Sequence, residues 1–282
     1  DPSGQLRWLA TELQKSEDLD QKVHILGHVP PGQEDCWNVW SKNFYQIITR
    51  YSSTVTAQFY GHTHYDEFKL FYHPIEKGRP ISSLFIGASL TPYTNLNPGY
   101  KIFSIDGARG QESTYHVLDH ETWIYNLTEA NMTPELPPRW FRLYRATEAY
   151  RLPNMLPQSL NTLVHRMSSN ISEFNLYYRY YYKATDIPTC DAVCRKRILC
   201  NIVTPYQKQQ TECMHLQTEV DGIVLPMRIF ETKRPSSDTK SSEEQVSMDS
   251  RQLSLRNFTS QPSENQPSLF DRIFGTRSYL FG

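Results

Sequence analysis

The sequence lacks the features that mark several large classes of protein. Its 282 residues carry a formal net charge of −1, which gives no electrostatic reason to expect a nucleic acid polymer as a partner. No apolar run approaches the roughly 18 residues that a transmembrane helix needs, so we expect no transmembrane segment. Four cysteines cluster between residues 190 and 213, but no pair of histidines stands among them at zinc-finger spacing. We therefore expect disulfides in this cluster and not a structural zinc ion.

The two ends of the sequence add to this list of absences. The sequence begins at Asp1 without an initiator methionine or a signal-peptide pattern, and we therefore expect it to be a piece of a longer protein. From about residue 235 onward, polar residues dominate without periodicity. We expect a polar, disordered tail over residues 218–282, in which residues 269–274 could form one short amphipathic turn.

What the sequence does contain is an apolar run, residues 57–60, that stops at Gly61 and then presents His62 and His64. The run is typical of a buried strand, and we expect Gly61 to supply a sharply bent backbone at its end. Two residues apart in extended chain, the imidazoles would lie on the same side and could reach two adjacent metal ions. A purely structural role for these histidines is the alternative.

A second segment, residues 22–32, repeats this pattern. An apolar strand ends at Gly27, His28 follows it, and a Pro-Pro-Gly turn comes next. His28 therefore matches His62, whereas His24 lies within the strand and is expected to be structural. Both histidine motifs would stand at the carboxyl ends of strands, where open α/β sheets bind ligands.

The rest of the chain predicts an α/β fold. Helical spacing of apolar residues predicts helices over residues 3–19, with Ser3 as the N-cap, and over residues 39–51. These helices alternate with the two strands that carry the histidines, which is typical of a layered α/β sheet. Shorter strands that would complete a second sheet are expected at residues 68–72, 81–86, 100–105 and 115–118. Residues 119–120 would then open a helical region that continues to about residue 217.

The histidine motifs resemble those of the calcineurin-like metallophosphoesterases, whose last two metal motifs are Gly-His and Gly-His-x-His. Within that family the sequence is similar to the acid sphingomyelinases, from residue 1 to about residue 213. The closer likeness depends on Cys36, Trp37 and Trp40, on residues 66–68, and on residues 96–100 and 119–122. The sphingomyelinase-like phosphodiesterases share the metal motifs but match these stretches less well, and they are the alternative.

The resemblance implies a fold and a metal site. Residues 1–119 would be the C-terminal half of a layered metallophosphoesterase β-sandwich flanked by helices, and residues 120–217 a disulfide-closed helical subdomain. His28 and His62 would bind one zinc ion and His64 a second. Two such ions bind phosphoryl oxygens and lower the pKa of a bridging water, and neutral imidazole suits zinc.

The family's other ligands and its histidine proton donor have no counterpart in residues 1–282. We do not expect the nearby acidic residues Asp35, Asp66 and Glu67 to replace them. The complete protein would therefore be a zinc-dependent phosphodiesterase, and the isolated chain would be inactive. The implied reaction is hydrolysis of sphingomyelin to ceramide and phosphocholine at a membrane surface. Action on nucleotides or other small phosphodiesters, or a non-catalytic secreted glycoprotein, are the alternatives.

Two aromatic features could bind lipid. Tyr93, in the loop after the 81–86 strand, could offer a ring face to the quaternary ammonium of choline, or it could simply pack in its loop. Residues 177–182 include five tyrosines, which could touch membrane lipid or pack on both faces of a helix, and we favour packing. His116 and His120 are expected to be structural.

The cysteines and sequons predict passage through the secretory pathway. The resemblance implies disulfides between Cys190 and Cys194 and between Cys200 and Cys213, with the partner of Cys36 upstream of this chain. Asn-x-Ser/Thr sequons stand at Asn126, Asn131, Asn170 and Asn257. Together these features predict a lysosomal or extracellular setting.

Overall fold

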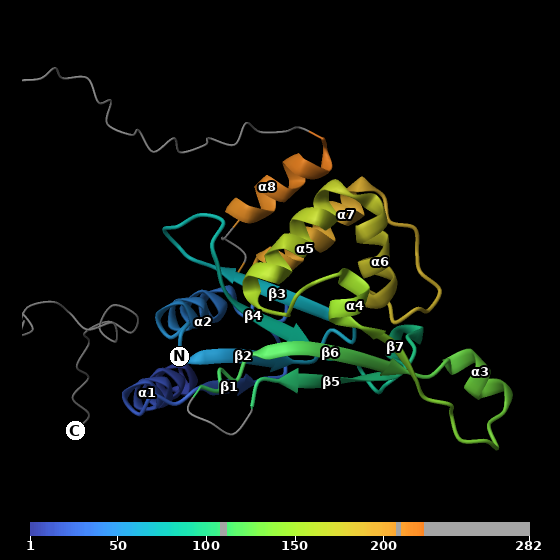
Figure 1. The fold of residues 1–282 in the computed structure, drawn as a ribbon, viewed down its shortest axis with the longest axis horizontal. Coiled ribbons are helices and arrows are strands. Elements are labelled where there is room, and N and C mark those ends of the chain that lie inside the picture. Colours follow the sequence, from blue (N-terminus) through green and yellow to red (C-terminus); the bar gives the residue numbers. More distant parts are fainter. Residues whose placement is uncertain (108–111, 207–209, 223–282) are drawn as a thin grey trace, which may run out of the picture. The chain divides into compact units, whose positions relative to one another are not determined.

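The computed structural model describes residues 1–107, 112–206 and 210–222 (Figure 1). Contacts divide the chain into two units, Asp1–Leu225 and Pro226–Gly282, and the described residues all lie in the first. The disordered tail expected over residues 218–282 begins later than predicted, because residues 218–220 belong to a helix (Thr211–Val220). Beyond residue 222 the expected tail, including Asn257 and the turn at 269–274, lies outside the described residues.

The first four elements follow the expected helix-strand-helix-strand order. They are α1 (Gln5–Asp18), β1 (Val23–Leu26), α2 (Asn38–Arg50) and β2 (Val55–Tyr60). The apolar positions at helical spacing are buried, namely Leu6, Ala10 and Leu13 in α1 and Phe44, Ile47 and Ile48 in α2. The prediction of Ser3 as the N-cap is wrong. Gly4 occupies that position with a φ of 70° and no side-chain cap, a backbone that glycine adopts without steric cost.

The first sheet has four strands in the order β1-β2-β4-β3. Strands β3 (Glu67–Tyr72) and β4 (Pro80–Ile86) form an antiparallel pair, and β4 runs parallel to β2. The prediction that these two strands belong to a second sheet is therefore wrong. All six residues of β3 are buried, since Leu70 belongs to the main core while Phe71 stacks on Tyr45 of α2 at 5.9 Å.

A second, antiparallel sheet has the order β5-β6-β7, from β5 (Gly99–Ile105), β6 (Val117–Ile124) and β7 (Phe141–Arg145). Residues 119–120 thus lie inside a strand, and the prediction that they open a helical region is wrong. The buried side of β6 carries His120, Thr122 and Ile124. Because two of these side chains are polar, the alternation that marks a half-buried strand is hidden in the sequence.

Helices follow the second sheet. After the short α3 (Leu127–Met132) in the β6–β7 connection come α4 (Ala146–Tyr150), α5 (Pro157–Ser169), α6 (Ile171–Tyr181), α7 (Ala192–Val203) and α8 (Thr211–Val220). A 3-10 turn, η1 (Tyr93–Asn95), lies between β4 and β5. In Figure 1 the helices α5 to α8 gather on one side of the strands, and α1 and α2 lie at one end. The helical region is thus real but begins at α4.

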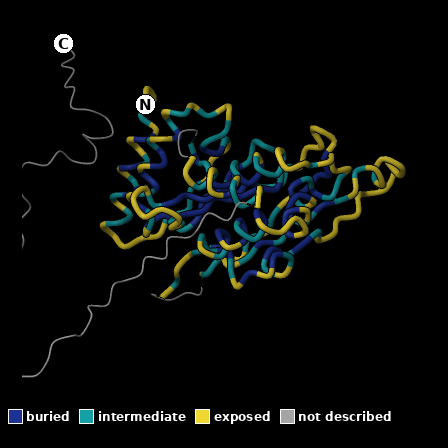
Figure 2. The backbone as a smooth tube through the Cα atoms, turned by 90° about the horizontal axis from the view of Figure 1, so that it is seen from above, coloured by how far each residue is buried: buried dark blue, intermediate teal, exposed yellow. Residues whose placement is uncertain are grey.

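Aromatic rings join the two sheets. The ring of Phe59 on β2 packs edge-on against Phe103 on β5 at 4.7 Å between centroids, and the ring of Phe85 on β4 lies 6.1 Å from that of His120 on β6. Figure 2 shows the buried segments running through the middle of the described unit, with exposed loops at its margins. The described residues therefore form a mixed α/β fold, as predicted for the class.

The tyrosine-rich stretch lies in α6 and its C-terminal end. Tyr177, Tyr178 and Tyr181 are buried, and Tyr180 stacks on Tyr144 of β7 at 4.1 Å between centroids. Tyr182 also packs against the core. The packed-helix interpretation is the one that this burial supports.

Two disulfides close the last helices. Cys190 bonds Cys194 at the start of α7, and Cys200 of α7 bonds Cys213 of α8, which are the two expected pairs. Within the part of the chain that the structure describes, none of the helices has the length and apolar character needed to cross a membrane.

Candidate functional site

Two parallel strands end side by side at the candidate site. The N–H of Gly27 donates to the carbonyl of Phe59 at 2.9 Å, and the N–H of Gly61 donates to the carbonyl of His28 at 3.0 Å. The backbone pairing of β1 and β2 thus continues past both strands and brings the two histidine motifs together. The rings of His28 and His62 meet edge to face, 5.2 Å between centroids.

The backbone around the motifs is not the one that the sequence predicts. The left-handed conformation falls on His62 and His64 themselves, with φ of 74° and 66°, and not on Gly61. Because a non-glycine residue in this region costs of order 1–3 kcal/mol, such strain is characteristic of functional sites. The prediction that the two histidines extend from one straight strand is therefore wrong. Gly27 has a different role, since a Cβ there would lie 2.5 Å from the ring of Tyr60.

Asp35 contacts the second histidine motif. Its Oδ2 lies 2.7 Å from Nε2 of His62, and its side chain is exposed. Carboxylates of this kind hold metal-binding histidines in one ring orientation and one tautomer. The structure therefore places Asp35 where it can orient His62 or contribute an oxygen ligand of its own.

Tyr93 lies beside the third histidine. Its ring meets that of His64 edge to face at 5.6 Å between centroids, and the tyrosine is 69% exposed. The loop that carries it is strained, because Thr94 and Asn95 both have positive φ, 64° and 59°. The structure thus brings a predicted substrate-binding residue next to a predicted metal ligand.

Asp66 and Glu67 carry buried side chains, and the carboxylate of Glu67 also hydrogen-bonds Thr63, between His62 and His64. Asp66 forms an ion pair with Lys101 of β5 at 2.6 Å, with both side chains almost fully buried. Glu67 accepts a hydrogen bond from the amide of Asn201 on α7 at 3.0 Å, and burial raises the pKa of its carboxyl. Both carboxylates therefore have partners within the fold.

The remaining histidines of this region have structural contacts. His24 bonds the carbonyl oxygen of Tyr115 through Nε2 at 2.7 Å, and His116 bonds that of Thr56 through Nδ1 at 3.1 Å. Burial lowers the pKa of His116, and it lowers that of the fully enclosed His120 much further. A neutral imidazole is therefore the stable form of His120 within the folded core.

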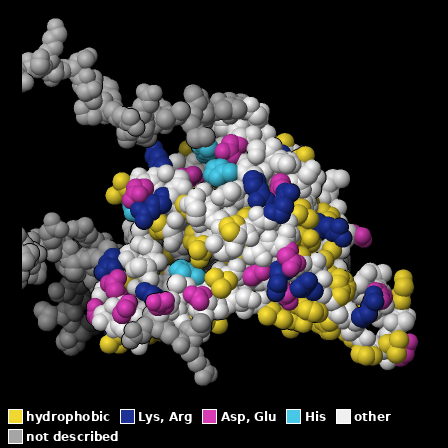
Figure 3. Space-filling view, in the orientation of Figure 1, with side chains coloured by type: hydrophobic (Ala, Val, Ile, Leu, Met, Phe, Trp, Pro, Cys, Tyr) yellow, Lys and Arg dark blue, Asp and Glu magenta, His cyan; other side chains and the backbone are white. Residues whose placement is uncertain are grey.

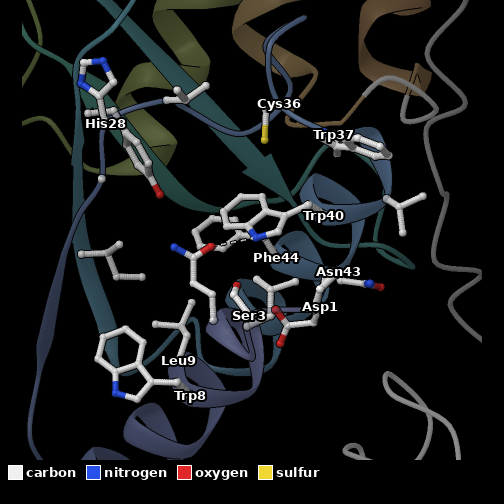
Figure 4. Close-up of a pocket in the computed structure, with 18 of the residues that line it drawn as sticks. Asp1, Ser3, Trp8, Leu9, His28, Cys36, Trp37, Trp40, Asn43 and Phe44 are labelled. Atoms are coloured by element: carbon white, nitrogen blue, oxygen red, sulfur yellow. Dashed lines mark hydrogen bonds between the residues drawn. The ribbon is translucent and has the colours of Figure 1, made fainter.

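A cavity of about 750 Å³ opens beside the first histidine motif. Figure 4 shows the indoles of Trp8, Trp37 and Trp40 around this cavity, with His28 at its end. Several of its lining side chains are unusually exposed for large apolar residues, including Trp37 at 82% and Leu26 at 81%. β1 forms the edge of its sheet, so its outer side has no partner among the described strands.

Imidazoles on two loops match the donor set that zinc prefers. The ring contacts join His28 to His62 and His64 to Tyr93, and the three predicted ligands do not bring their ring nitrogens within 4.8 Å of one another. A different group gathers metal-binding atoms. Among the described residues, only His165, His215 and Glu219 bring three such atoms within 4.8 Å of one another. Sequence analysis missed this group, whose one signal is the four-residue spacing of His215 and Glu219.

Three of the four sequons lie in the described region. Asn126, Asn131 and Asn170 are all exposed. The side chains of Asn126 and Asn170 cap α3 and α6, accepting backbone hydrogen bonds through Oδ1. The amide nitrogen of each, the atom that receives a glycan, takes no part in these cap hydrogen bonds.

Comparison with known proteins gives consistent matches. Residues 79–220 match the family model described as "Acid sphingomyelin phosphodiesterase C-terminal region". The chain is 46% identical over 217 residues to sphingomyelin phosphodiesterase of Bos taurus and 44% identical over 220 residues to that of Homo sapiens. These alignments cover 77% and 78% of this chain but only 34% of each relative. Acid sphingomyelinase-like phosphodiesterase 3b of Mus musculus is 32% identical over 231 residues, covering 76% of this chain and 49% of that protein.

Proposed function

Because this chain belongs to the acid sphingomyelin phosphodiesterase family and corresponds to its C-terminal region, we propose that the complete protein hydrolyses sphingomyelin to ceramide and phosphocholine. The chain spans about a third of the length of the two sphingomyelin phosphodiesterases compared above. The observation that carries the proposal is the meeting of His28 and His62 at the ends of two parallel strands, with His64 two residues further on.

In this proposal the three histidines bind two zinc ions. His28 and His62 hold one ion and His64 the other, with further ligands from the upstream part of the protein. The zinc pair supplies Lewis-acid stabilisation of the phosphoryl oxygens and a water of lowered pKa. Asp35 fixes the ring of His62 through its contact with Nε2.

Tyr93 binds the choline group. Its exposed ring stands next to His64, so a phosphodiester held near that histidine would extend its quaternary ammonium toward an aromatic face. Cation–π attraction of this kind contributes about 0.5–2 kcal/mol, depending on how far water is excluded. Tyr93 is thus proposed to select choline phosphodiesters over others.

The upstream part completes the fold. We propose that it adds strands beside β1 to complete a layered metallophosphoesterase sandwich, covers the cavity around Trp37 and Leu26, and brings the disulfide partner of Cys36. Three observations support this: the unpaired edge of β1, the exposed apolar side chains beside it, and the absence of a bonded partner for Cys36 among the described cysteines. The proton donor also belongs to that part, so this chain alone is expected to be inactive.

The setting is proposed to be lysosomal or extracellular. Two disulfides persist best in an oxidising compartment, and the three described sequons are exposed to a glycosylating enzyme. Glycans at Asn126, Asn131 and Asn170 would be removed by an endoglycosidase, which gives a direct mass measurement of this part of the proposal.

The test measures zinc content and phosphodiesterase activity together. The longest protein that contains this sequence, its His62→Ala variant and the isolated chain are each assayed against sphingomyelin and against a nucleotide diester. His73→Ala is the matched control, since His73 lies beside Glu76 on the surface, in the β3–β4 connection. The long protein should prefer sphingomyelin, and His62→Ala should hold at least one zinc ion fewer than the unaltered long protein and lose most of the activity.

Two other outcomes of this test would favour the alternative functions. A long protein that holds zinc but prefers the nucleotide diester would replace sphingomyelin with small phosphodiesters, as in the alternative drawn from the sphingomyelinase-like relatives. A long protein without zinc or activity would be a non-catalytic glycoprotein, and the roles assigned to His28, His62 and His64 would be wrong.

A further inference from the structure

We propose that His165, His215 and Glu219 form a second, separate metal site, which binds one zinc ion between α5 and α8. The site shares no residue with the histidine motifs at the ends of β1 and β2, and it does not depend on the proposed hydrolysis. It is the one place in the described part of the chain where three metal-binding atoms converge.

The geometry matches the needs of a tetrahedral ion. His165 Nδ1 lies 3.0 Å from Glu219 Oε1, and His215 Nδ1 lies 3.3 Å from the same oxygen. Ligands bound to zinc at about 2.1 Å in a tetrahedral arrangement lie about 3.4 Å apart. Each histidine nitrogen therefore stands from the Glu219 oxygen at almost the distance that one shared ion would impose, and all three donor atoms lie within 4.8 Å of one another.

The helices supply these residues in a favourable arrangement. His215 and Glu219 are four residues apart on α8, so both project from one face of that helix. His165 comes from α5, which packs beside α8 in the described unit. Two histidines and one glutamate, with a water molecule as the fourth ligand, are an established ligand set for zinc.

Neighbouring contacts fix the ligands in place. The hydroxyl of Ser168 donates to Glu219, so the carboxylate is held from a second side. Arg195 of α7 donates to the carbonyl oxygens of Met167 and Ser168 at 2.7 Å and 2.6 Å, which anchors the end of α5 next to His165. Contacts of this kind to metal ligands orient them and strengthen binding.

An ion can reach the site from solvent. The side chains of His165, His215 and Glu219 are 36%, 47% and 27% exposed. Figure 3 shows histidine and acidic side chains gathered at one place on the surface over α8. A direct hydrogen-bonded cluster without an ion is the competing interpretation, because the same Nδ1 atoms face the carboxylate in either case.

The site would hold one end of α8. The Cys200–Cys213 disulfide ties the first turn of α8 to α7, and Lys196 of α7 pairs with Asp221 just after the helix at 2.5 Å. A metal ion at His215 and Glu219 would add a bond from α8 to α5. The helices α5, α7 and α8 would then be linked to one another, α8 to α7 by the disulfide and the ion pair and α8 to α5 by the metal ion.

The experiment counts zinc in the full 282-residue chain. Protein stripped with a chelator is reloaded with zinc, desalted and measured for zinc per chain by mass spectrometry of the metal. The variants are His215→Ala and Glu219→Gln, with His73→Ala as the control. Nδ1 of His73 also lies near a glutamate, 3.7 Å from Oε1 of Glu76. Among the described residues, however, His73 does not belong to a group of three metal-binding side chains. The unaltered chain and His73→Ala should each hold about one zinc more than His215→Ala or Glu219→Gln.

A second pair of measurements separates this site from the proposed catalytic one. The same count in a His28→Ala/His62→Ala background should still fall by one ion when His215→Ala is added. Zinc-soaked crystals should show an anomalous peak bounded by His165, His215 and Glu219. Equal zinc in all variants, with no peak at this place, would mean a hydrogen-bonded cluster only and would overturn the proposal, whatever the result at His28 and His62.

Discussion

A buried ion pair joins the two sheets at the scale of single residues. Lys101 on β5 and Asp66 before β3 are 2.6 Å apart, and the second carboxylate oxygen of Asp66 accepts a hydrogen bond from Thr122 on β6 at 2.7 Å. The backbone N–H of Asp66 also donates to the carbonyl of Tyr181. Both oxygens of the Asp66 carboxylate therefore have a partner. Removing Lys101 leaves that buried carboxylate without its ion-pair partner.

Lys101→Met should lower the free energy of unfolding by about 3–5 kcal/mol, the usual cost of leaving one member of a buried pair alone. The double variant Lys101→Met/Asp66→Leu should recover part of that loss, because the Lys101–Asp66 pair is then gone while the buried ammonium of Lys183 loses the charge of Asp66. Denaturant unfolding of both variants and the original chain measures the difference. A single variant within about 1 kcal/mol of the original would show that the pair is not buried in solution.

His120 should make the stability depend on pH. Burial holds the pKa of this histidine well below 6.5 in the folded state, whereas the unfolded chain takes up the proton near pH 6.5. Below that pH the unfolded state binds more protons, so the free energy of unfolding falls as pH falls, by up to about 1.4 kcal/mol per unit.

His120→Gln should reduce this slope between about pH 6.5 and 5, measured by denaturant unfolding at several pH values. Some slope should remain, since burial also lowers the pKa of His116. The comparison uses the slope and not the absolute stability, so packing losses from the substitution do not affect it. An unchanged slope would contradict a neutral buried His120.

Tyr93 gives a test of substrate choice at one residue. In the complete protein, Tyr93→Ala should lose up to about tenfold of the preference for choline phosphodiesters, which corresponds to roughly 1.4 kcal/mol of cation–π attraction. Tyr93→Phe keeps the ring and should retain most of the preference. Steady-state kinetics on choline and ethanolamine phosphodiesters would show the change, and equal selectivity in Tyr93→Ala would remove the role.

At the scale of elements, α8 depends on covalent attachment more than on its own burial. Among the described residues of α8, only Leu216 is buried. The helix is joined to α7 by Cys200–Cys213, which closes a loop of 13 residues in sequence separation. A disulfide stabilises chiefly by restricting the unfolded chain, and the effect grows with loop length.

Replacing both Cys200 and Cys213 by serine should therefore lower the free energy of unfolding by about 3 kcal/mol. The matched control replaces Cys190 and Cys194, whose sequence separation is only 4, and should cost about 1 kcal/mol less. Thermal and denaturant unfolding of the two double variants measure this order. The reverse order would indicate that strain or packing, and not loop closure, sets the contribution of each bond.

At the scale of the whole molecule, the exposed apolar surface beside β1 is the most prominent feature. Trp8 is 62% exposed, Leu26 is 81% exposed and Trp37 is 82% exposed, and all three line the same cavity. The isolated chain should therefore bind a dye such as ANS strongly at this surface, and the longer protein should bind much less. Leu26→Lys in the isolated chain should weaken dye binding, whereas Ile75→Lys should not, because Ile75 is 83% exposed in the β3–β4 connection and does not line the cavity.

Much of this molecule could be predicted from sequence because the signals are local. The strands before His28 and His62 are apolar runs that end in glycine, and α2 buries Phe44, Ile47 and Ile48 at helical spacing. The assignment of β3 and β4 to a sheet could not be predicted, because the pairing partner of each strand depends on contacts distant in sequence.

The candidate site at the ends of β1 and β2 was predicted only in part, because only some of its features have a local signal in the sequence. The histidines follow from their motifs, but the left-handed backbone of His62 does not, because Gly61 is the residue expected to adopt it. The contact of Asp35 with His62 joins residues 27 positions apart, and that of His165 with Glu219 joins residues 54 apart. The local sequence around these residues does not predict either contact.

The left-handed backbone of His62 and His64 is part of the fold of this segment. The conformational cost, about 1–3 kcal/mol for each residue, therefore belongs to folding and not to ligand binding. Glycine at either position would remove this cost from folding, since glycine adopts a left-handed backbone without a steric penalty. The two histidine rings are thus retained at the expense of stability in the fold that carries them.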